Sequence, residues 1–197
     1  AMFELCEELK VDKLYISHLV YSGRGKDNLE IDISKEQRRK YVEFIIDKAF
    51  EYYKNGNNID LVTGNMEMDA IMLLDRFKKE YPDFVETLEQ KLKAWGGNSA
   101  GYRLGNMDWA GNVKPDPFFP FVVGNYLETP FDEIWTSSSN DILNKLREHP
   151  RQIKGRCAQC KYIEICNGGS RSRAYAISGD LWEEDPSCYL TLEETRR

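Results

Sequence analysis

The chain has 197 residues, of which 41% are hydrophobic, so it can bury one good core or two small ones. Its formal net charge of -6 argues against nucleic acid or an anionic membrane surface as the main partner. No apolar run approaches membrane-spanning length and the first residues lack a signal-peptide pattern, so we expect no membrane partner and a cytoplasmic location.

The first residues predict a short amphipathic helix that ends near Val11. Its apolar side chains recur at the i, i+3, i+4 and i+7 positions of one helix face, namely Met2, Leu5, Cys6 and Leu9. Residues 14–21, LYISHLVY, predict a strand that is apolar on both faces, as buried parallel strands tend to be. The loop residues SGRGKDN then close this strand.

A long helix is predicted to begin after Ser34, which forms a capping-box pattern with Gln37, and to end at Asn55-Gly56. Its expected apolar stripe is Tyr41, Phe44, Ile45, Ala49 and Tyr52. Residues 58–64, NIDLVTG, predict a second strand. The order helix, strand, helix, strand is typical of the closing units of an α/β barrel or a doubly wound sheet.

The next segment, from Met66 to about Trp95, predicts helix with a break before Pro82, and Gly96-Gly97 marks a linker. We therefore expect two regions, residues 1–95 and residues 96–197. The second region is predicted to contain a β-hairpin over residues 101–116 that turns at residues 110–112, and short helices over residues 129–135 and 139–149.

Four of the five cysteines follow, with the spacing C-x2-C-x5-C-x21-C: Cys157, Cys160, Cys166 and Cys188. Two thiolates two residues apart can hold one metal centre from a tight turn, and two more can complete a four-sulfur site. Buried thiols or a disulfide are the alternative, but cysteines acting as small hydrophobes would be scattered over apolar faces. The pattern therefore predicts a metal site.

The metal itself is open between zinc and iron. Zinc ribbons usually offer two C-x-x-C pairs, whereas this chain has one, and the longer gaps are closer to iron–sulfur spacing. Nearby cations can compensate four thiolates in either case, and they are Arg151, Lys154, Arg156, Lys161, Arg171 and Arg173. Gly168 and Gly169 either let backbone N–H groups approach the sulfurs or form an ordinary turn.

Four stretches occur in a specific order and cover about half of the chain. They are G-N-V-x-P at 111–115, L-x-x-P-F-x-E-I-W at 127–135, L-x-x-L-R at 143–147 and C-x2-C-x5-C-x-G-G at 157–169. This order resembles the SPASM/twitch extension of radical S-adenosylmethionine (SAM) enzymes. More narrowly, SHLVYSGRG, KGRCAQCKYIEIC and GDLWEEDPSCYLTLEE resemble the radical SAM enzymes of haem biosynthesis, which act in haem d1 formation and the siroheme-to-haem route.

The resemblance implies an α/β fold, α+β overall, in which the last βα units of a partial TIM-type barrel precede a cluster-binding domain of a β-hairpin plus helices. It implies one auxiliary [4Fe-4S] cluster on the four cysteines, because Asp116 and Ser170 stand where full SPASM domains carry further cysteines. The parent enzyme is expected to remove or modify carboxylate side chains of an iron tetrapyrrole oxidatively. The auxiliary cluster would relay electrons, and an electron donor or acceptor protein is an expected partner.

The C-x3-C-x2-C loop that binds the SAM-cleaving cluster is not found in these residues. We therefore expect a C-terminal fragment that is inactive alone, with SAM and its own [4Fe-4S] cluster bound only by the full-length parent. Two alternatives stay open: a fragment of a radical SAM peptide or protein maturase, and a zinc-binding interaction module.

Two residues are candidate substrate contacts. His18 shares a strand face with Leu14 and Ile16, and it could meet the substrate if that face lines a barrel interior; the alternative is a hydrogen-bonded core histidine. Arg24 lies on the loop after the strand, at the end where α/β barrels bind ligands, and a guanidinium suits a carboxylate arm; the alternative is a surface arginine.

Overall fold

The structure is a computed structural model that describes residues 1–196; Arg197, the last residue of the expected second region, lies outside the described residues. The first half contains α1 (Met2–Glu8), β1 (Lys13–Ser17), α2 (Lys35–Lys54), β2 (Asp60–Gly64), α3 (Asp69–Glu80) and α4 (Val85–Trp95). The second half contains β3 (Asn106–Met107), β4 (Asn112–Lys114), β5 (Gly124–Asn125), α5 (Phe131–Thr136), α6 (Asp141–Arg147), α7 (Ile163–Cys166), α8 (Arg171–Ser178) and α9 (Leu192–Thr195). Short 3-10 helices are η1 (Gly23–Ile31), η2 (Pro82–Phe84) and η3 (Gly155–Gln159). Within residues 1–196, no helix combines the length and the apolar character needed to cross a membrane.

The strands β1 and β2 form a parallel pair whose register runs from Lys13 opposite Asp60 to Ser17 opposite Gly64. The parallel strand expected in this region is therefore confirmed, but it ends at Ser17. The prediction of two apolar faces is wrong, because Tyr15 is 62% exposed and only the face that carries Leu14 packs into a core. That core includes Tyr52 of α2, so α2 covers this face of the sheet.

Helix α1 buries Cys6 as predicted, but the rest of its expected stripe, Met2, Leu5 and Leu9, is exposed. Phe3 makes the apolar contact instead, with its ring 5.5 Å from that of Phe44. The face of α1 that packs inward is therefore the one that carries Phe3 and Cys6, and not the predicted face.

Helix α2 has the predicted capping box, in which the Gln37 N–H donates to Ser34 Oγ and the Gln37 side chain accepts from the Ser34 N–H. The helix also ends before Gly56, as predicted. The predicted apolar stripe is only partly buried. Ile45 and Tyr52 are buried, but Tyr41 and Phe44 are about half exposed. The buried positions that were missed are Arg38 and Val42.

The predicted break at Pro82 is confirmed, since η2 separates α3 from α4. Gly96 ends α4 in the left-handed conformation, with φ of 74°, as a helix C-cap glycine does. The predicted helix over residues 66–80 begins later, at Asp69.

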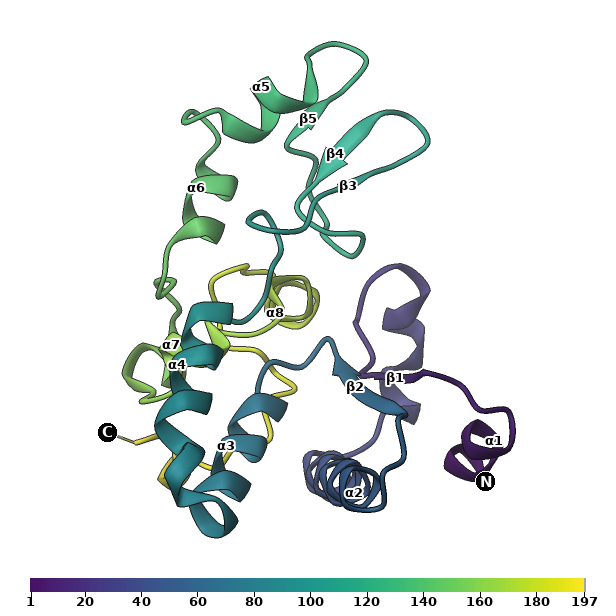
Figure 1. The fold of residues 1–197 in the computed structure, drawn as a ribbon. Coiled ribbons are helices and arrows are strands. Elements are labelled where there is room, and N and C mark those ends of the chain that lie inside the picture. Colours follow the sequence, from purple (N-terminus) through teal and green to yellow (C-terminus); the bar gives the residue numbers. More distant parts are fainter. Residues whose placement is uncertain (197) are drawn as a thin grey trace.

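The predicted β-hairpin is confirmed as β3 and β4, which pair antiparallel with Met107 opposite Val113. Its turn lies slightly earlier than expected, because the Gly111 N–H donates to the Asp108 carbonyl. A third strand that was not predicted, β5, pairs with β4, and the short helices α5 and α6 follow as expected. Together β3, β4, β5 and α5 form a separate lobe at the top of Figure 1.

The main core combines both halves of the chain. It contains residues of α2 and α3, residues around α7, and the segment before α9: Val42, Met66, Met68, Ile71, Met72, Leu74, Cys160, Tyr162, Ile165, Cys166, Cys188, Tyr189 and Leu190. Accordingly, α3 and α4 lie beside α7 in Figure 1, and the C-terminal segment passes close to them. Three of the four clustered cysteines thus lie in the main core.

Candidate metal centre

The four predicted ligands are all buried, with exposed fractions of 8% for Cys157 and 6% for Cys160, Cys166 and Cys188. Every pair among these four thiols is close enough for one charge to perturb the pKa of another. The fold therefore brings Cys188, which is distant in sequence, beside the three cysteines of the 157–166 segment. All five cysteines of the chain are free thiols.

Tight local turns fix the first three cysteines. The Cys160 N–H donates to the Cys157 carbonyl at 3.2 Å, and the Cys166 N–H donates to the Tyr162 carbonyl at 3.1 Å. The Gly169 N–H then donates to the Cys166 carbonyl at 3.0 Å. These bonds place three thiols along two consecutive turns, as the short spacing predicted.

Burial makes these thiols poor acids. It raises the pKa of Cys157 to about 12 and raises the pKa values of Cys166 and Cys188 as well. Two backbone groups act in the opposite direction: the N–H of Gly168 lowers the pKa of Cys166, and the N–H of Leu190 lowers the pKa of Cys188. Gly168 thus acts on Cys166, whereas a hydrogen bond from a glycine N–H to a cluster sulfur stays a prediction.

Three of the six expected cations act on the thiols. Arg171 lowers the pKa of Cys157, Arg156 lowers that of Cys188, and the Arg151 and Cys166 charges also interact. Arg171 is 1% exposed and donates to the Leu181 carbonyl at 2.8 Å, so it also holds the loop after α8.

The other three cations serve elsewhere. Arg173 forms an ion pair with Asp185 at 2.7 Å, Lys154 pairs with Asp180, and the Lys161 ammonium lies over the ring of Tyr162. The four thiols are ligands that fit an iron–sulfur centre. The three nearby guanidinium groups and the two backbone N–H groups can balance its negative charge. In residues 1–196, no group of three or more His, Cys, Asp or Glu side chains has the arrangement of a site for a single metal ion.

The two positions that interrupt the longer cysteine pattern have local structural partners. Ser170 is the N-cap of α8, and its Oγ accepts from the Arg173 N–H at 3.2 Å. Asp116 accepts from the Phe118 N–H at 2.7 Å, and burial raises its pKa to about 6.

The two candidate substrate contacts lie in different environments. His18 follows β1, and its Nε2 lies 2.9 Å from Asp69 Oδ2. The same carboxylate accepts from the Tyr189 hydroxyl through Oδ1 at 2.6 Å. Arg24 is exposed on η1, where its carbonyl accepts from Asn28 Nδ2 at 3.1 Å.

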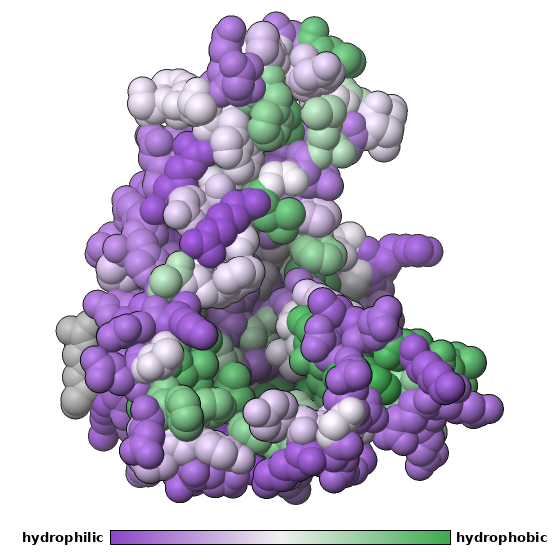
Figure 2. Space-filling model, in the orientation of Figure 1, coloured by the Kyte–Doolittle hydropathy of each residue, from purple (hydrophilic) through white to green (hydrophobic). Residues whose placement is uncertain are grey.

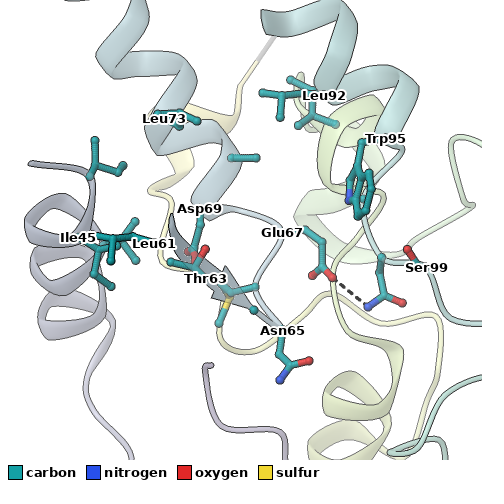
Figure 3. Close-up of a pocket in the computed structure, with 18 of the residues that line it drawn as sticks. Ile45, Leu61, Thr63, Asn65, Glu67, Asp69, Leu73, Leu92, Trp95 and Ser99 are labelled. Atoms are coloured by element: carbon teal, nitrogen blue, oxygen red, sulfur yellow. Dashed lines mark hydrogen bonds between the residues drawn. The ribbon is translucent and has the colours of Figure 1, made fainter. Parts of the chain in front are cut away.

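A cavity of about 580 Å³ lies between α2, β2, α3 and α4. Figure 2 shows apolar side chains gathered around a hollow in this part of the molecule. In Figure 3, Ile45, Leu61 and Leu73 line one side, and Glu67 lies on the other side near Trp95. The Glu67 carboxylate accepts from Asn98 Nδ2 at 2.9 Å, the contact dashed in Figure 3, and burial raises the pKa of Glu67. The described residues that line this cavity include Glu67 and Asp69 but no Lys, Arg or His, so it does not suit a polyanionic ligand.

Sequence reasoning missed the residues that hold the segment around Cys188, which are Tyr21, Asp32, Arg38, Asp69 and Tyr189. One signal was available. Arg38, Val42 and Ile45 have the spacing of one helix face, which indicates that Arg38 is buried with the two apolar residues. A buried charged residue needs a polar partner, so the spacing also indicated that Arg38 has one.

No family model matches the chain. The chain is 41% identical to pre-heme d1 synthase of Dinoroseobacter shibae, over 98% of the chain and 48% of that protein. It is 36% identical to Fe-coproporphyrin III synthase of Methanosarcina barkeri, over 98% of the chain and 50% of that protein. The chain therefore spans about half the length of these curated relatives.

A solved structure described as native anSMEcpe with bound AdoMet and Cp18Cys peptide has a similar fold. Its TM-score is 0.56 at 17% identity, and the match covers 94% of this chain and 48% of that one. The mixed α/β fold of this chain is thus shared with about half of that structure. By sequence, the chain is homologous to about half of pre-heme d1 synthase and of Fe-coproporphyrin III synthase, and the resemblance to radical SAM enzymes of haem biosynthesis predicted from the sequence is confirmed.

Proposed function

We propose that this chain is the auxiliary-cluster half of a radical SAM enzyme that modifies carboxylate side chains of an iron tetrapyrrole. In this proposal, Cys157, Cys160, Cys166 and Cys188 hold one [4Fe-4S] cluster. The observation that carries the proposal is the gathering of four buried, mutually interacting thiols in one place.

The surroundings of the thiols support a redox role for the site. A bound [4Fe-4S] cluster accepts and donates single electrons at a potential set by charge, burial and hydrogen bonds to sulfur. Arg151, Arg156 and Arg171 supply the charge here, and the buried position of the thiols excludes water. The N–H groups of Gly168 and Leu190, which lower the pKa values of Cys166 and Cys188, are the candidates to donate hydrogen bonds to two of the sulfurs.

The second part of the proposal concerns substrate and partners. The relatives are named for pre-heme d1 and for Fe-coproporphyrin III, and both names point to an iron tetrapyrrole. Arg24 is exposed after the carboxyl end of β1 and is the candidate to bind a carboxylate arm. We also propose that the parent protein binds SAM, exchanges electrons with a partner protein, and divides near residue 95 into a barrel region and a cluster region.

The cluster assignment can be tested by Mössbauer spectroscopy on protein reconstituted with ⁵⁷Fe under anaerobic conditions. The proposal predicts the valence-delocalised iron of a cubane [4Fe-4S] cluster. A spectrum of isolated tetrahedral iron sites, or stoichiometric zinc without sulfide in the anaerobically purified protein, would support a mononuclear site instead.

A further inference from the structure

Cys188 lies in a segment without regular secondary structure, between the end of α8 at Ser178 and the start of α9 at Leu192. A local bond holds its backbone, from the Cys188 N–H to the Asp185 carbonyl at 3.1 Å. Ordering the rest of the segment costs backbone entropy that long-range contacts must offset. Ser187 and Tyr189, the residues on either side of Cys188, make such contacts with side chains of the first half of the chain.

The residue before Cys188 is held by a buried polar group. Arg38 of α2 is 2% exposed, and its Nη1 donates to the Ser187 carbonyl at 3.2 Å. Tyr21 lies 3.0 Å from Ser187 Oγ through its hydroxyl. Asp32 joins the two, since it accepts from Tyr21 and from Arg38 Nη2, each at 2.7 Å.

The carboxylate of this group is ionised in the folded chain. Burial acts to raise the pKa of Asp32, but the hydrogen bond from Tyr21 and the charge of Arg38 outweigh it, so the pKa lies below its ordinary value. The ionised carboxylate therefore fixes both side chains that contact Ser187, the Tyr21 hydroxyl and the Arg38 guanidinium. Bonds to ionised groups are roughly twice as strong as neutral ones.

The residue after Cys188 is held in the same way. The Tyr189 hydroxyl donates to Asp69 Oδ1 at 2.6 Å, and His18 occupies the other oxygen of that carboxylate at 2.9 Å. Tyr189 and Asp69 are 5% and 6% exposed. His18 thus completes a buried network and orients Asp69 toward Tyr189.

We propose that these two clamps, Tyr21–Asp32–Arg38 on Ser187 and His18–Asp69 on Tyr189, position Cys188 as the fourth ligand of the metal centre. The inference rests on the proposed function, because it assumes that Cys188 binds the cluster. It assigns positioning roles to five residues of the first half of the chain. The cluster site is then shared between both halves instead of belonging to residues 96–197 alone.

The test uses the iron-loaded chain under anaerobic conditions and the variants Tyr189→Phe and Tyr21→Phe. Each removes one hydroxyl and keeps the ring. The matched control is Tyr53→Phe, which removes the hydroxyl of a tyrosine that is 84% exposed. Two quantities are measured: the rate of iron release to a ferrous chelator, and hydrogen exchange of residues 185–190.

Loss of one bond to a charged group typically changes an equilibrium by about ten- to hundred-fold. We therefore expect each clamp variant to release iron at least about ten-fold faster than Tyr53→Phe, with faster exchange confined to residues 185–190. Unchanged hydrogen exchange in α2 shows that the variants fold. If Tyr21→Phe does not fold, Tyr189→Phe alone still tests the proposal.

The outcomes separate the two proposals. If wild-type protein holds a full cluster but both clamp variants release iron at the control rate, the clamps do not position Cys188 and only this inference fails. If wild-type protein holds no iron and sulfide under anaerobic conditions, the proposed function fails first and the inference fails with it.

Discussion

Arg156 connects the first and the fourth cysteine of the pattern. It is the residue before Cys157, and its Nη2 donates to the carbonyl of Cys188 at 2.9 Å. Its Nη1 donates to the Leu190 carbonyl at 2.7 Å, and its Nε lies 3.3 Å from Glu184 Oε2. A single guanidinium therefore ties the C-x-x-C turn to the segment of the fourth ligand.

Replacing Arg156 by lysine should weaken this connection, because one ammonium cannot reproduce the planar fork. We expect a loss of about 1–3 kcal/mol in the free energy of unfolding and a lower iron content. Urea unfolding with iron analysis measures both. Lys154→Ala is the control, since its side chain is 62% exposed and its ion pair with Asp180 lies on the surface, where solvent screens it. Equal effects of the two changes would contradict a special role for Arg156.

A second prediction concerns Gly97, which supports the metal segment from outside. A Cβ at Gly97 would lie 2.4 Å from the Cys166 carbonyl oxygen, and its φ of +70° is strained for other residues. Gly97→Ala should therefore destabilise the chain and displace the turn that carries Cys166.

Gly56→Ala provides the comparison for Gly97→Ala. Gly56 has a φ of +68° but no atom within 4 Å of the added Cβ, so it carries the same backbone strain without the collision. We expect Gly97→Ala to lower both the melting temperature and the iron content further than Gly56→Ala. The same iron content in the two variants would show that the 97–166 contact does not shape the site.

The third prediction is a pH dependence at Asp116. Burial raises its pKa from 3.8 to about 6, with Glu67 also raising it and Arg151 lowering it. Since the folded state favours the protonated acid, stability contributed by Asp116 is present below pH 4 and is lost as the pH rises toward 6. Above pH 6 the charged form costs on the order of 2–3 kcal/mol.

Asp116→Asn keeps an acceptor for the Phe118 N–H and removes the charge. Denaturant unfolding at several pH values should therefore show the variant gaining stability over wild type between pH 4 and 6 and holding that gain above pH 6. A difference that is constant from pH 4 to 7.5 would mean that Asp116 does not titrate in this range in the folded chain.

The fourth prediction rests on the proposed function and concerns substrate binding by the SAM-binding parent protein that the proposal assumes. Arg24→Ala should weaken binding of an iron tetrapyrrole by about ten- to hundred-fold, because a charged hydrogen bond to a carboxylate is lost. Lys26→Ala is the control, since Lys26 is exposed on the same 3-10 helix. Soret absorption titrations measure both, and equal affinities of the two variants would remove Arg24 from the binding site.

Features that depend on neighbouring residues were predictable from the sequence. The capping box of Ser34 and Gln37, the break at Pro82 and the turns around Cys157 and Cys160 all follow from local backbone chemistry. The spacing of the four cysteines also indicated their gathering, because a multi-ligand site requires it.

Features that depend on tertiary contacts were not predictable. Tyr41 and Phe44 have the hydrophobicity of core residues, yet Arg38 is a buried residue of α2, because it bonds to the buried Ser187 carbonyl and to the partly buried Asp32. Asp69 lies in an apolar run, and nothing local indicates that it bonds both to His18 and to Tyr189, the latter 120 residues away in sequence. Such long-range polar pairs carry no periodic signal.

The most direct test of the cluster is its composition in three anaerobically prepared proteins: wild type, Cys160→Ser and Cys6→Ser. Cys6 is a buried thiol that packs with Tyr52 and Ile59, so its loss should leave the site intact. The account predicts about four irons and four sulfides per chain in wild type and in Cys6→Ser, with clear loss in Cys160→Ser. Stoichiometric zinc without sulfide in wild type, or iron content that does not depend on Cys160, would contradict it.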